Sequence, residues 1–279
     1  MTLDPKKYVT DPADGLPCEI VGAWAQEKYE RVTKYIDISR WARRKFLNGQ
    51  AKQATFIDLY SGPGRCQIKG QAGFVDGGCV AGWKKAEHGG HPFTKILISD
   101  AEAKLSGAAE SRLTAIGATV VPSVGNAEDN VGGVVEAINP YGLHFAYLDP
   151  FNLTSLPFSI IQTLARLKHV DMLIHVSVMD LQRNAMNYSA DDVQHLDRFA
   201  PGWRNIVPVV PNAETFRTNY LRYWKSLVSD LEMEVNEGME LVRGTRGERL
   251  YWLAFIARDK TAHKFWNEIR DVKGQGRLL

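Results

Sequence analysis

Three acidic residues, Asp58, Asp100 and Asp149, lie at or just after short apolar runs that lead into loops with glycine, proline or asparagine. Apolar runs of this length are typical of buried strands in a parallel sheet. The carboxyl ends of such strands meet at one edge of an open α/β sheet, where these folds bind their ligands. We therefore expect the three acids to face one binding site.

The loop after Asp58 contains Gly62-Pro63-Gly64, and glycine lets a backbone turn tightly and approach a ligand closely. Two glycines alone are typical of any tight turn between a strand and a helix. Asp100 favours a ligand site, because a carboxylate after the next strand can accept hydrogen bonds from both ribose hydroxyls. Together they predict a nucleoside-type cofactor. No phosphate is implied, because the loop lacks the lysine of a phosphate-binding loop and Asp58 would repel a pyrophosphate.

Asn126 and Ala127 follow the third predicted strand. An amide there can bond to an adenine edge as both donor and acceptor. Alternatively Asn126 caps the next helix, and the two roles do not exclude each other. The predicted cofactor-binding residues are Asp58, Tyr60, Ser61, Gly62, Gly64, Arg65, Asp100, Ala101, Asn126 and Ala127.

The segment Asp149-Pro150-Phe151-Asn152 places a polar group beside an aromatic ring. Methyl transfer to an exocyclic amine requires that the nitrogen lone pair is freed and that the flat ring is held, and such a segment can do both. The alternative is a turn in which Pro150 fixes the backbone and Phe151 packs into the core. These four residues are the catalytic candidates.

Other polar residues have competing interpretations. Asp180 and Arg183 follow the fifth predicted strand and either contact the substrate or form a salt bridge within their loop. His144 and His175 lie within predicted strands, so we interpret both as hydrogen-bonded core residues. No His, Cys and Asp residues have metal-ligand spacing, so we predict no metal site. A basic set either contacts phosphates or covers a solvated surface: Arg40, Arg43, Arg44, Lys45, Arg243, Arg246 and Arg249.

The chain has 279 residues, a net charge of +2 and 10% aromatic residues, which indicates a well-cored globular protein. Cys18, Cys66 and Cys79 lack C-x-x-C spacing, which favours reduced thiols and a cytoplasmic protein. The polar, proline-bearing N-terminus is unlike a signal peptide, and no apolar run reaches the roughly 20 residues that span a bilayer. We expect no membrane partner, and the composition favours no particular oligomeric state.

Residues 1–50 are expected to form an extended arm (1–20) and one helix (21–47), and residues 51–279 the main domain, with a helical insertion or cap over 187–232. The predicted strands are 55–59, 95–99, 119–123, 144–148 and 171–178, and the helices between them are 78–87, 102–116, 130–138 and 157–167. Helices at 187–199 and 214–231 precede a hairpin of 233–242 with 249–257 and a last helix at 261–270.

Five parallel units followed by a terminal hairpin resemble the sheet of class I S-adenosylmethionine (SAM)-dependent methyltransferases, whose final strand runs antiparallel. We therefore predict an α/β, Rossmann-like class I methyltransferase fold with a mostly parallel seven-stranded sheet and a C-terminal antiparallel hairpin. SAM is the cofactor that this resemblance implies.

The chain also resembles the three-Cys-motif partner (TcmP) family over roughly residues 20–270. The resemblance rests on segments 21–28, 56–65, 75–78, 148–151, 156–157, 178–184 and 265–266. It implies a SAM site and a partner, a radical-SAM-like protein encoded nearby. The cysteines in the family name belong to that partner and not to this chain.

The loop 58–64 is similar to the cofactor loop of RNA and DNA amino-methyltransferases, where an aromatic residue often replaces the first glycine, as Tyr60 does here. Those enzymes carry Asp/Asn-Pro-Pro-aromatic after the fourth strand, whereas this chain lacks the second proline. The resulting hypothesis is SAM-dependent N-methylation of a nucleobase or nucleoside, in RNA, DNA or a small molecule. The alternatives are another small-molecule acceptor, a non-catalytic cofactor-binding subunit for the partner protein, and a mobile-element accessory protein that binds nucleic acid.

Overall fold

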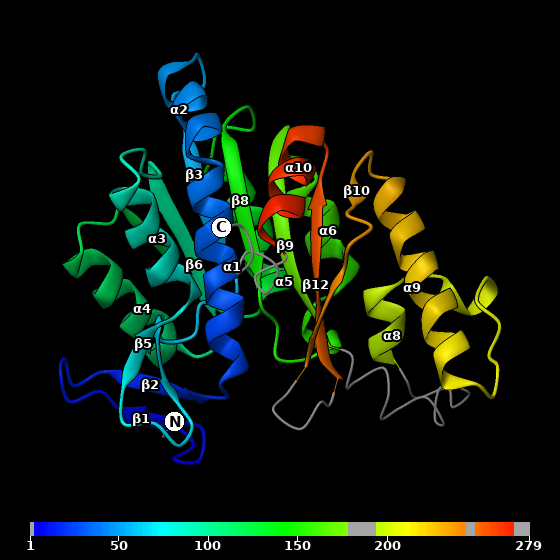
Figure 1. Cartoon of the computed structure of the whole chain (residues 1–279), viewed down its shortest axis with the longest axis horizontal. Helices are drawn as coiled ribbons and strands as arrows, with labels where there is room; N and C mark the ends of the chain where they lie inside the picture. Colours follow the sequence, from blue (N-terminus) through cyan, green and yellow to red (C-terminus); the bar gives the residue numbers. More distant parts are fainter. Residues whose placement is uncertain (1–2, 178–193, 244–248, 271–279) are drawn as a thin grey trace, which may run out of the picture.

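The computed structural model describes residues 3–177, 194–243 and 249–270 (Figure 1). Its central sheet has the strand order β10-β12-β9-β8-β3-β6-β7, and β11 also pairs with β12. These strands are β3 (Ala54–Asp58), β6 (Lys95–Asp100), β7 (Val120–Val124), β8 (Leu143–Leu148), β9 (His169–Ser177), β10 (Glu234–Val235), β11 (Glu240–Arg243) and β12 (Arg249–Ala257). Strands β9, β8, β3, β6 and β7 are parallel, and β12 is antiparallel to β9. The predicted fold class is therefore confirmed.

The order of the strands reverses beside β3. The chain runs outward from β3 to β6 and β7, and then returns to β8 on the other side of β3 and continues to β9. Every residue of β3 is buried, as expected of a central strand covered on both faces. A reversal of this kind opens a crevice at the carboxyl ends of β3 and β8, where open α/β sheets bind ligands.

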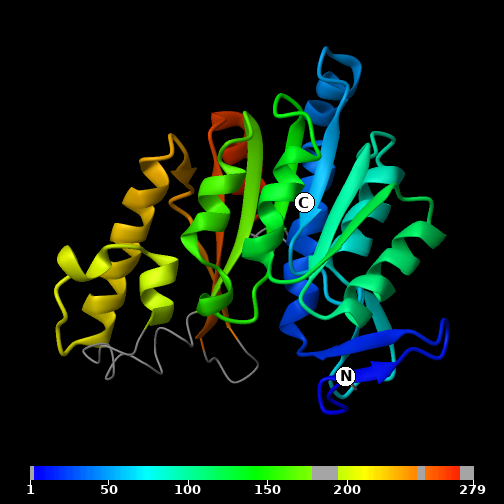
Figure 2. The same cartoon turned by 180° about the vertical axis from the view of Figure 1, so that it is seen from behind.

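Helices cover both faces of the sheet (Figures 1 and 2). One face carries α1 (Trp24–Ile38), α3 (Gly78–His88), α4 (Ala103–Ala115) and α10 (Lys260–Ile269), and the other carries α5 (Ala127–Glu136), α6 (Phe158–Leu164) and α9 (Ala213–Ser229). Alternate residues of the strands enter the two cores: Phe56 belongs with Trp83 to the core on the α1 side, and Ile57 belongs with Ile161 to the core on the α5 side. This alternation is the period-2 pattern of a strand.

The single helix predicted over residues 21–47 is wrong, because the chain breaks at Ser39 into α1 and α2 (Arg40–Asn48). The Ser39 hydroxyl donates to the carbonyl of Tyr35 at 2.7 Å. The Arg43 guanidinium turns back and donates to the carbonyls of Ile36 and His91, at 2.5 and 3.0 Å. The Arg43 guanidinium thus supplies a donor to the Ile36 carbonyl at the break, while the Tyr35 carbonyl also accepts the Ser39 N–H at 3.0 Å.

Arg43 is only 1% exposed, so both interpretations of it, as a phosphate contact and as a charge on a solvated surface, are wrong. Burial lowers its pKa to about 10. Helix α2 also lies at the end of the sheet opposite to the carboxyl ends of the strands (Figure 1). The basic stretch 40–45 is therefore far from the ligand-binding edge. Of the other predicted basic residues, Arg246 lies outside the described residues.

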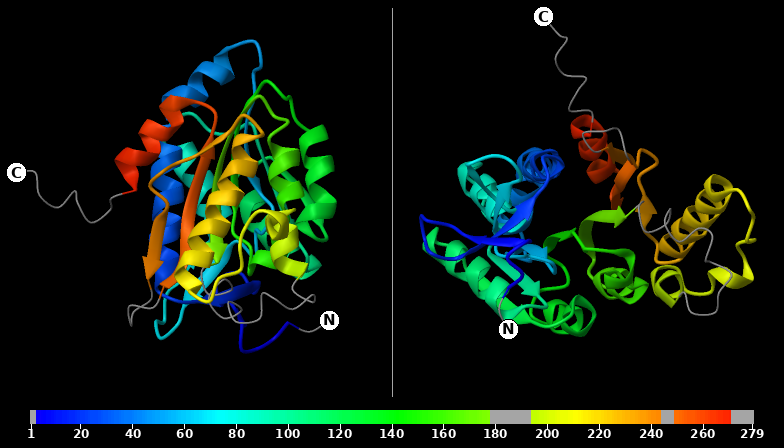
Figure 3. Two further views of the ribbon diagram at one scale, coloured as in Figure 1. Left: turned by 90° about the vertical axis from the view of Figure 1, so that its right-hand side faces the viewer. Right: turned by 90° about the horizontal axis from the view of Figure 1, so that it is seen from below.

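A second, four-stranded sheet has the order β1-β2-β4-β5. Its strands are β1 (Tyr8–Thr10), β2 (Pro17–Val21), β4 (Arg65–Ile68) and β5 (Phe74–Asp76). The segment expected to be an extended arm thus forms strands, and β2 runs parallel to β4, with Glu19 opposite Cys66. This sheet joins residues on both sides of the predicted boundary at residue 50. It lies beneath the carboxyl edge of the central sheet (Figures 1 and 3).

The helical segment before the hairpin comprises α8 (Gln194–Phe199), the short helix η2 (Trp203–Asn205) and α9. Residues 187–193 of the predicted helix lie outside the described residues. A cluster of aromatic rings holds this segment together. Phe199 stacks on Trp224 with ring centroids 5.1 Å apart, and Trp203 lies edge-on to Phe216 with ring centroids 5.5 Å apart. No helix in the described ranges is long and apolar enough to cross a membrane.

Candidate active site

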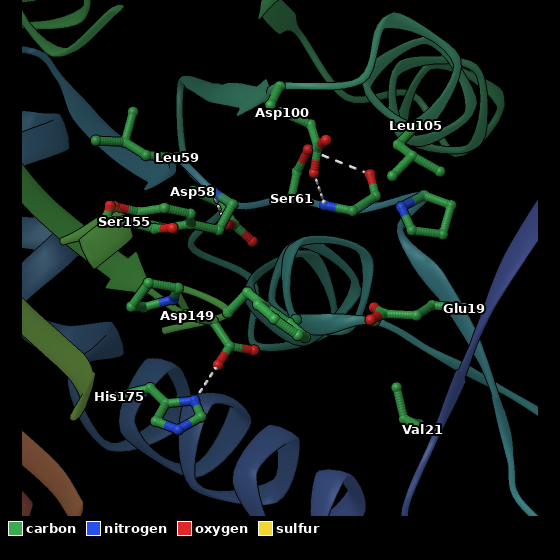
Figure 4. Close-up of a pocket in the computed structure, with 18 of the residues that line it drawn as sticks. Glu19, Val21, Asp58, Leu59, Ser61, Asp100, Leu105, Asp149, Ser155 and His175 are labelled. Atoms are coloured by element: carbon green, nitrogen blue, oxygen red, sulfur yellow. Dashed lines mark hydrogen bonds and ion pairs between the residues drawn. The ribbon is translucent and has the colours of Figure 1, made fainter. Parts of the chain in front are cut away.

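A cavity of about 1120 Å³ opens at the carboxyl ends of β3, β6 and β8 and is closed from below by residues of the second sheet. Figure 4 shows Asp58, Asp100 and Asp149 around it, with Glu19 reaching in from the second sheet. The three acids that the sequence placed at one edge therefore do line one space.

The glycine turn after β3 is tied to Asp100. Gly62 and Gly64 have φ angles of 53° and 73°, which L side chains rarely adopt. One carboxylate oxygen of Asp100 accepts the Gly62 N–H at 3.0 Å, and the other accepts the Glu102 N–H at 2.9 Å. Burial raises the pKa of Asp100. Asp100 therefore organises the turn and also presents a carboxylate to the cavity.

Asp58 ends β3 beneath the turn and is 1% exposed. Its carboxylate accepts the Tyr60 N–H at 3.1 Å. Burial raises the pKa of Asp58 to about 8, and the Tyr60 hydrogen bond opposes that rise only in part. The Tyr60 hydroxyl donates to the carbonyl of Ser155, which anchors the ring to the short helix η1 (Leu153–Ser155). Both residues therefore shape the wall of the cavity on the side of the central sheet.

Asn126 and Ala127 line the cavity at the start of α5. Asn126 occupies the N-cap position without a capping side-chain bond, and its amide instead donates to Asp129 at 3.3 Å. Ser61 and Ala101 are also in the lining. Arg65 is not, because it lies in β4 and forms ion pairs with Asp11 and Asp76.

Asp149 has three partners that draw distant parts of the chain together. Lys28 of α1 lies 2.5 Å from one carboxylate oxygen, and the Tyr147 hydroxyl donates to the same oxygen at 3.0 Å. The Nδ1 atom of His175 lies 2.6 Å from the other oxygen. Burial acts to raise the pKa of Asp149, but Lys28 and His175 outweigh it and hold that pKa below its ordinary value. Asp149 is therefore ionised at neutral pH.

The rest of the predicted catalytic segment divides between the cavity and the surrounding structure. Phe151 is 81% exposed at the cavity mouth, so the alternative that it packs into the core is wrong. The Lys7 ammonium lies 4.8 Å from its ring centroid. Pro150 lines the cavity, whereas Asn152 does not. The Asn152 side chain accepts the Ser155 N–H at 2.9 Å and so caps η1.

No protein-family model matches the chain, and no curated protein matches it. Among solved structures, a Legionella pneumophila protein aligns with a TM-score of 0.49 at 9% identity, over 87% of this chain and 91% of that one. Trm1 from Pyrococcus horikoshii with S-adenosyl-L-methionine aligns with a TM-score of 0.48 at 9% identity, over 94% of this chain and 63% of that one. An O-methyltransferase from Bacillus cereus in complex with SAH aligns with a TM-score of 0.47 at 10% identity, over 81% of this chain and 79% of that one. The strand order, rather than these distant likenesses, establishes the fold.

The lining residues that sequence reasoning missed include Glu19, Lys28 and His175. His175 was assigned to the core because it lies within an apolar run. Its place near the carboxyl end of β9, next to β8, was a signal that it faces the same edge as Asp149. Glu19 and Lys28 had no such local signal, because only the packing of the N-terminal elements brings them to the cavity.

Asp180 and Arg183 lie outside the described residues. Within the described ranges, no group of three or more His, Cys, Asp or Glu residues is placed to hold a metal ion. The three cysteines are buried free thiols, and burial raises the pKa of each.

Proposed function

We propose that this protein is a SAM-dependent methyltransferase. The observation that carries the proposal is the bond from the Gly62 N–H to the Asp100 carboxylate, at 3.0 Å, inside a cavity at the switch point of the sheet. This bond connects two features: the glycine turn, which a ligand can approach closely, and Asp100, the acid at the end of the next strand. That combination suits a nucleoside whose ribose hydroxyls donate to a carboxylate.

The charge of the cavity favours SAM over a phosphate-bearing cofactor. Burial raises the pKa of Asp58 to about 8 and that of Glu19 to about 7, so both acids favour a cationic ligand that would let them ionise. SAM carries a sulfonium and an ammonium. A pyrophosphate beside the turn would instead keep both acids in their neutral form and would gain no such attraction.

In this assignment the turn, with Asp58, Tyr60, Ser61, Gly62 and Gly64, surrounds the methionine end. Asp100 and Ala101 bind the ribose, and Asn126 and Ala127 lie against the adenine. Methyl transfer is an in-line displacement, so holding the two reactants in position supplies much of the rate.

The acceptor that we propose is a nitrogen of a nucleobase or nucleoside. Asp149 is ionised, and each carboxylate oxygen can accept two hydrogen bonds. The oxygen that faces His175 therefore has capacity for an acceptor N–H. The exposed Phe151 ring, which also lines the cavity, offers a stacking surface for a flat base.

The test has two parts. Calorimetry should detect binding of SAM, or of its demethylated product, to the purified ligand-free protein, and no binding would refute the proposal. Incubation with methyl-labelled SAM and separate RNA, DNA and metabolite fractions should then label one of them. Binding without transfer to any fraction would favour the alternative, a cofactor-binding subunit that serves a radical-SAM-like partner.

A further inference from the structure

Glu19 approaches the glycine turn from outside the central sheet. It lies in the middle of β2, and its side chain points into the cavity opposite Asp100 and Asp149 (Figure 4). A Cβ atom on Gly62 would lie 3.6 Å from a carboxylate oxygen of Glu19. The second sheet therefore brings a carboxylate directly over the turn.

This carboxylate lacks a protein partner. In the part of the chain that the structure describes, Glu19 makes no side-chain hydrogen bond or ion pair, although it is half-buried. Burial first, and then Asp149, raise its pKa, while Lys28 and Lys7 act in the opposite direction. A half-buried carboxylate is costly unless a cation or hydrogen-bond donor satisfies it. A ligand that places a cation beside Glu19 would satisfy this carboxylate.

The positions of the other acids indicate which part of the ligand lies beside Glu19. Asp100 marks the ribose end and Asp149 the acceptor end, and the turn at Gly62 lies beside the remaining part of the cofactor. Asp58 lies beneath the turn and one of its oxygens already accepts the Tyr60 N–H. Glu19 is the carboxylate that faces this part across open space.

We propose that Glu19 binds the ammonium of the methionine end of SAM. The inference rests on the proposed function. It makes the second sheet part of the cofactor site, so that β2 closes over a ligand that the central sheet holds from the other side.

The experiment compares Glu19→Gln with the wild type by calorimetry, using three probes. SAM and S-adenosylhomocysteine both carry the ammonium, whereas 5′-methylthioadenosine lacks the amino-acid end. We expect the variant to bind the first two about tenfold or more weakly, the loss of one charged hydrogen bond, and to bind methylthioadenosine as the wild type does. Glu30→Gln, on the exposed side of α1, is the matched control and should change nothing.

Other outcomes would overturn the inference. Unchanged binding of all three probes would remove Glu19 from the cofactor site. Loss of SAM binding alone would place Glu19 at the sulfonium and contradict the ammonium assignment. An equal loss of all three probes would show a general disturbance of the cavity. Failure of the wild type to bind any probe would instead refute the proposed function itself.

Discussion

The ammonium of Lys28 lies 2.5 Å from the carboxylate of Asp149 and joins α1 to the end of β8 inside the cavity. The two side chains are 8% and 17% exposed, so water screens the pair weakly. A helix that precedes the alternating strands and helices thus supplies the main cation that keeps Asp149 ionised.

Replacing Lys28 by Met should leave Asp149 partly buried without its closest cation. We expect the free energy of unfolding to fall by about 3 kcal/mol, because removing one partner of a buried ion pair leaves the other as an uncompensated buried charge. The pKa of Asp149 should also rise, and methyl transfer should be lost. Urea unfolding measures the first effect. Lys34→Met on the same helix, where the ion pair with Glu30 is solvated, should change stability by less than about 0.5 kcal/mol. Equal effects of the two substitutions would contradict the role of Lys28.

The central sheet could be predicted because its parallel strands are buried and read as continuous apolar runs. The run at 144–148, for example, is followed at once by Asp149-Pro150, so both the strand and its loop were visible locally. The edge at which Asp58, Asp100 and Asp149 meet followed from the same reasoning.

The second sheet could not be predicted in this way. Strands β4 and β5 are short and lie beside the glycine turn, and β4 pairs with β2, which is far earlier in the chain. No local period reveals a pairing of that kind, since short strands are stabilised by partners rather than by propensity. The role of Glu19 depends on this pairing, and that of Lys28 on the packing of the adjoining helix α1, so neither had a local signal.

Replacing Asp100 by Ala should weaken SAM binding by about 1–3 kcal/mol, because hydrogen bonds between the ribose and a charged carboxylate are lost. The turn should also loosen, since Asp100 holds the Gly62 N–H. Calorimetry measures the affinity. Asp230→Ala, at the exposed end of α9, is the control and should bind SAM as the wild type does. Unchanged affinity of Asp100→Ala would remove that residue from the site.

The stability of the ligand-free protein should fall as pH rises from about 6.5 to 9, above the range in which the lowered pKa of His144 acts in the opposite sense. The pKa of Asp58 is raised from 3.8 to about 8 by burial, so the folded state holds a proton that the unfolded state releases. The stabilisation is therefore complete below the unfolded pKa and is lost as pH passes through the folded one. Glu19 and Asp171, whose pKa values are each raised to about 7, act in the same sense.

Urea midpoints across that range measure the slope. Asp58→Asn should reduce it without removing it, because Asn does not ionise while Glu19 and Asp171 still do. The same slope in Asp58→Asn and the wild type would contradict the raised pKa of Asp58. SAM should bind more tightly as pH rises through the same range, because a cationic ligand favours the ionised acids.

The two glycines of the turn should differ in their tolerance of Ala. Gly64→Ala should cost about 2–3 kcal/mol, because φ is positive and the new Cβ would lie 3.0 Å from a methyl of Val80 and 3.3 Å from the Cα of Ala109. Gly62→Ala should cost about 1 kcal/mol, since its φ is positive but its surroundings are open. Gly107→Ala, within α4 and with no atom close to the new Cβ, should stabilise by about 0.5–1 kcal/mol. Thermal or urea unfolding ranks the three, and a reversed order would contradict this account of the turn.

Replacing Phe151 by Ala should weaken binding of the acceptor and leave binding of SAM unchanged. The ring is 81% exposed at the cavity mouth, so its removal should cost little stability. We expect the KM for the labelled acceptor fraction to rise about tenfold, because stacking of one base on an aromatic ring contributes about 1–3 kcal/mol, while SAM affinity stays unchanged. Phe151→Tyr keeps the ring and should keep the KM. Tyr141→Ala is the matched control, because Tyr141 is 66% exposed but precedes β8 at the opposite edge of the sheet. An unchanged KM in Phe151→Ala would place the acceptor elsewhere, and a loss of SAM affinity would assign the ring to the cofactor instead.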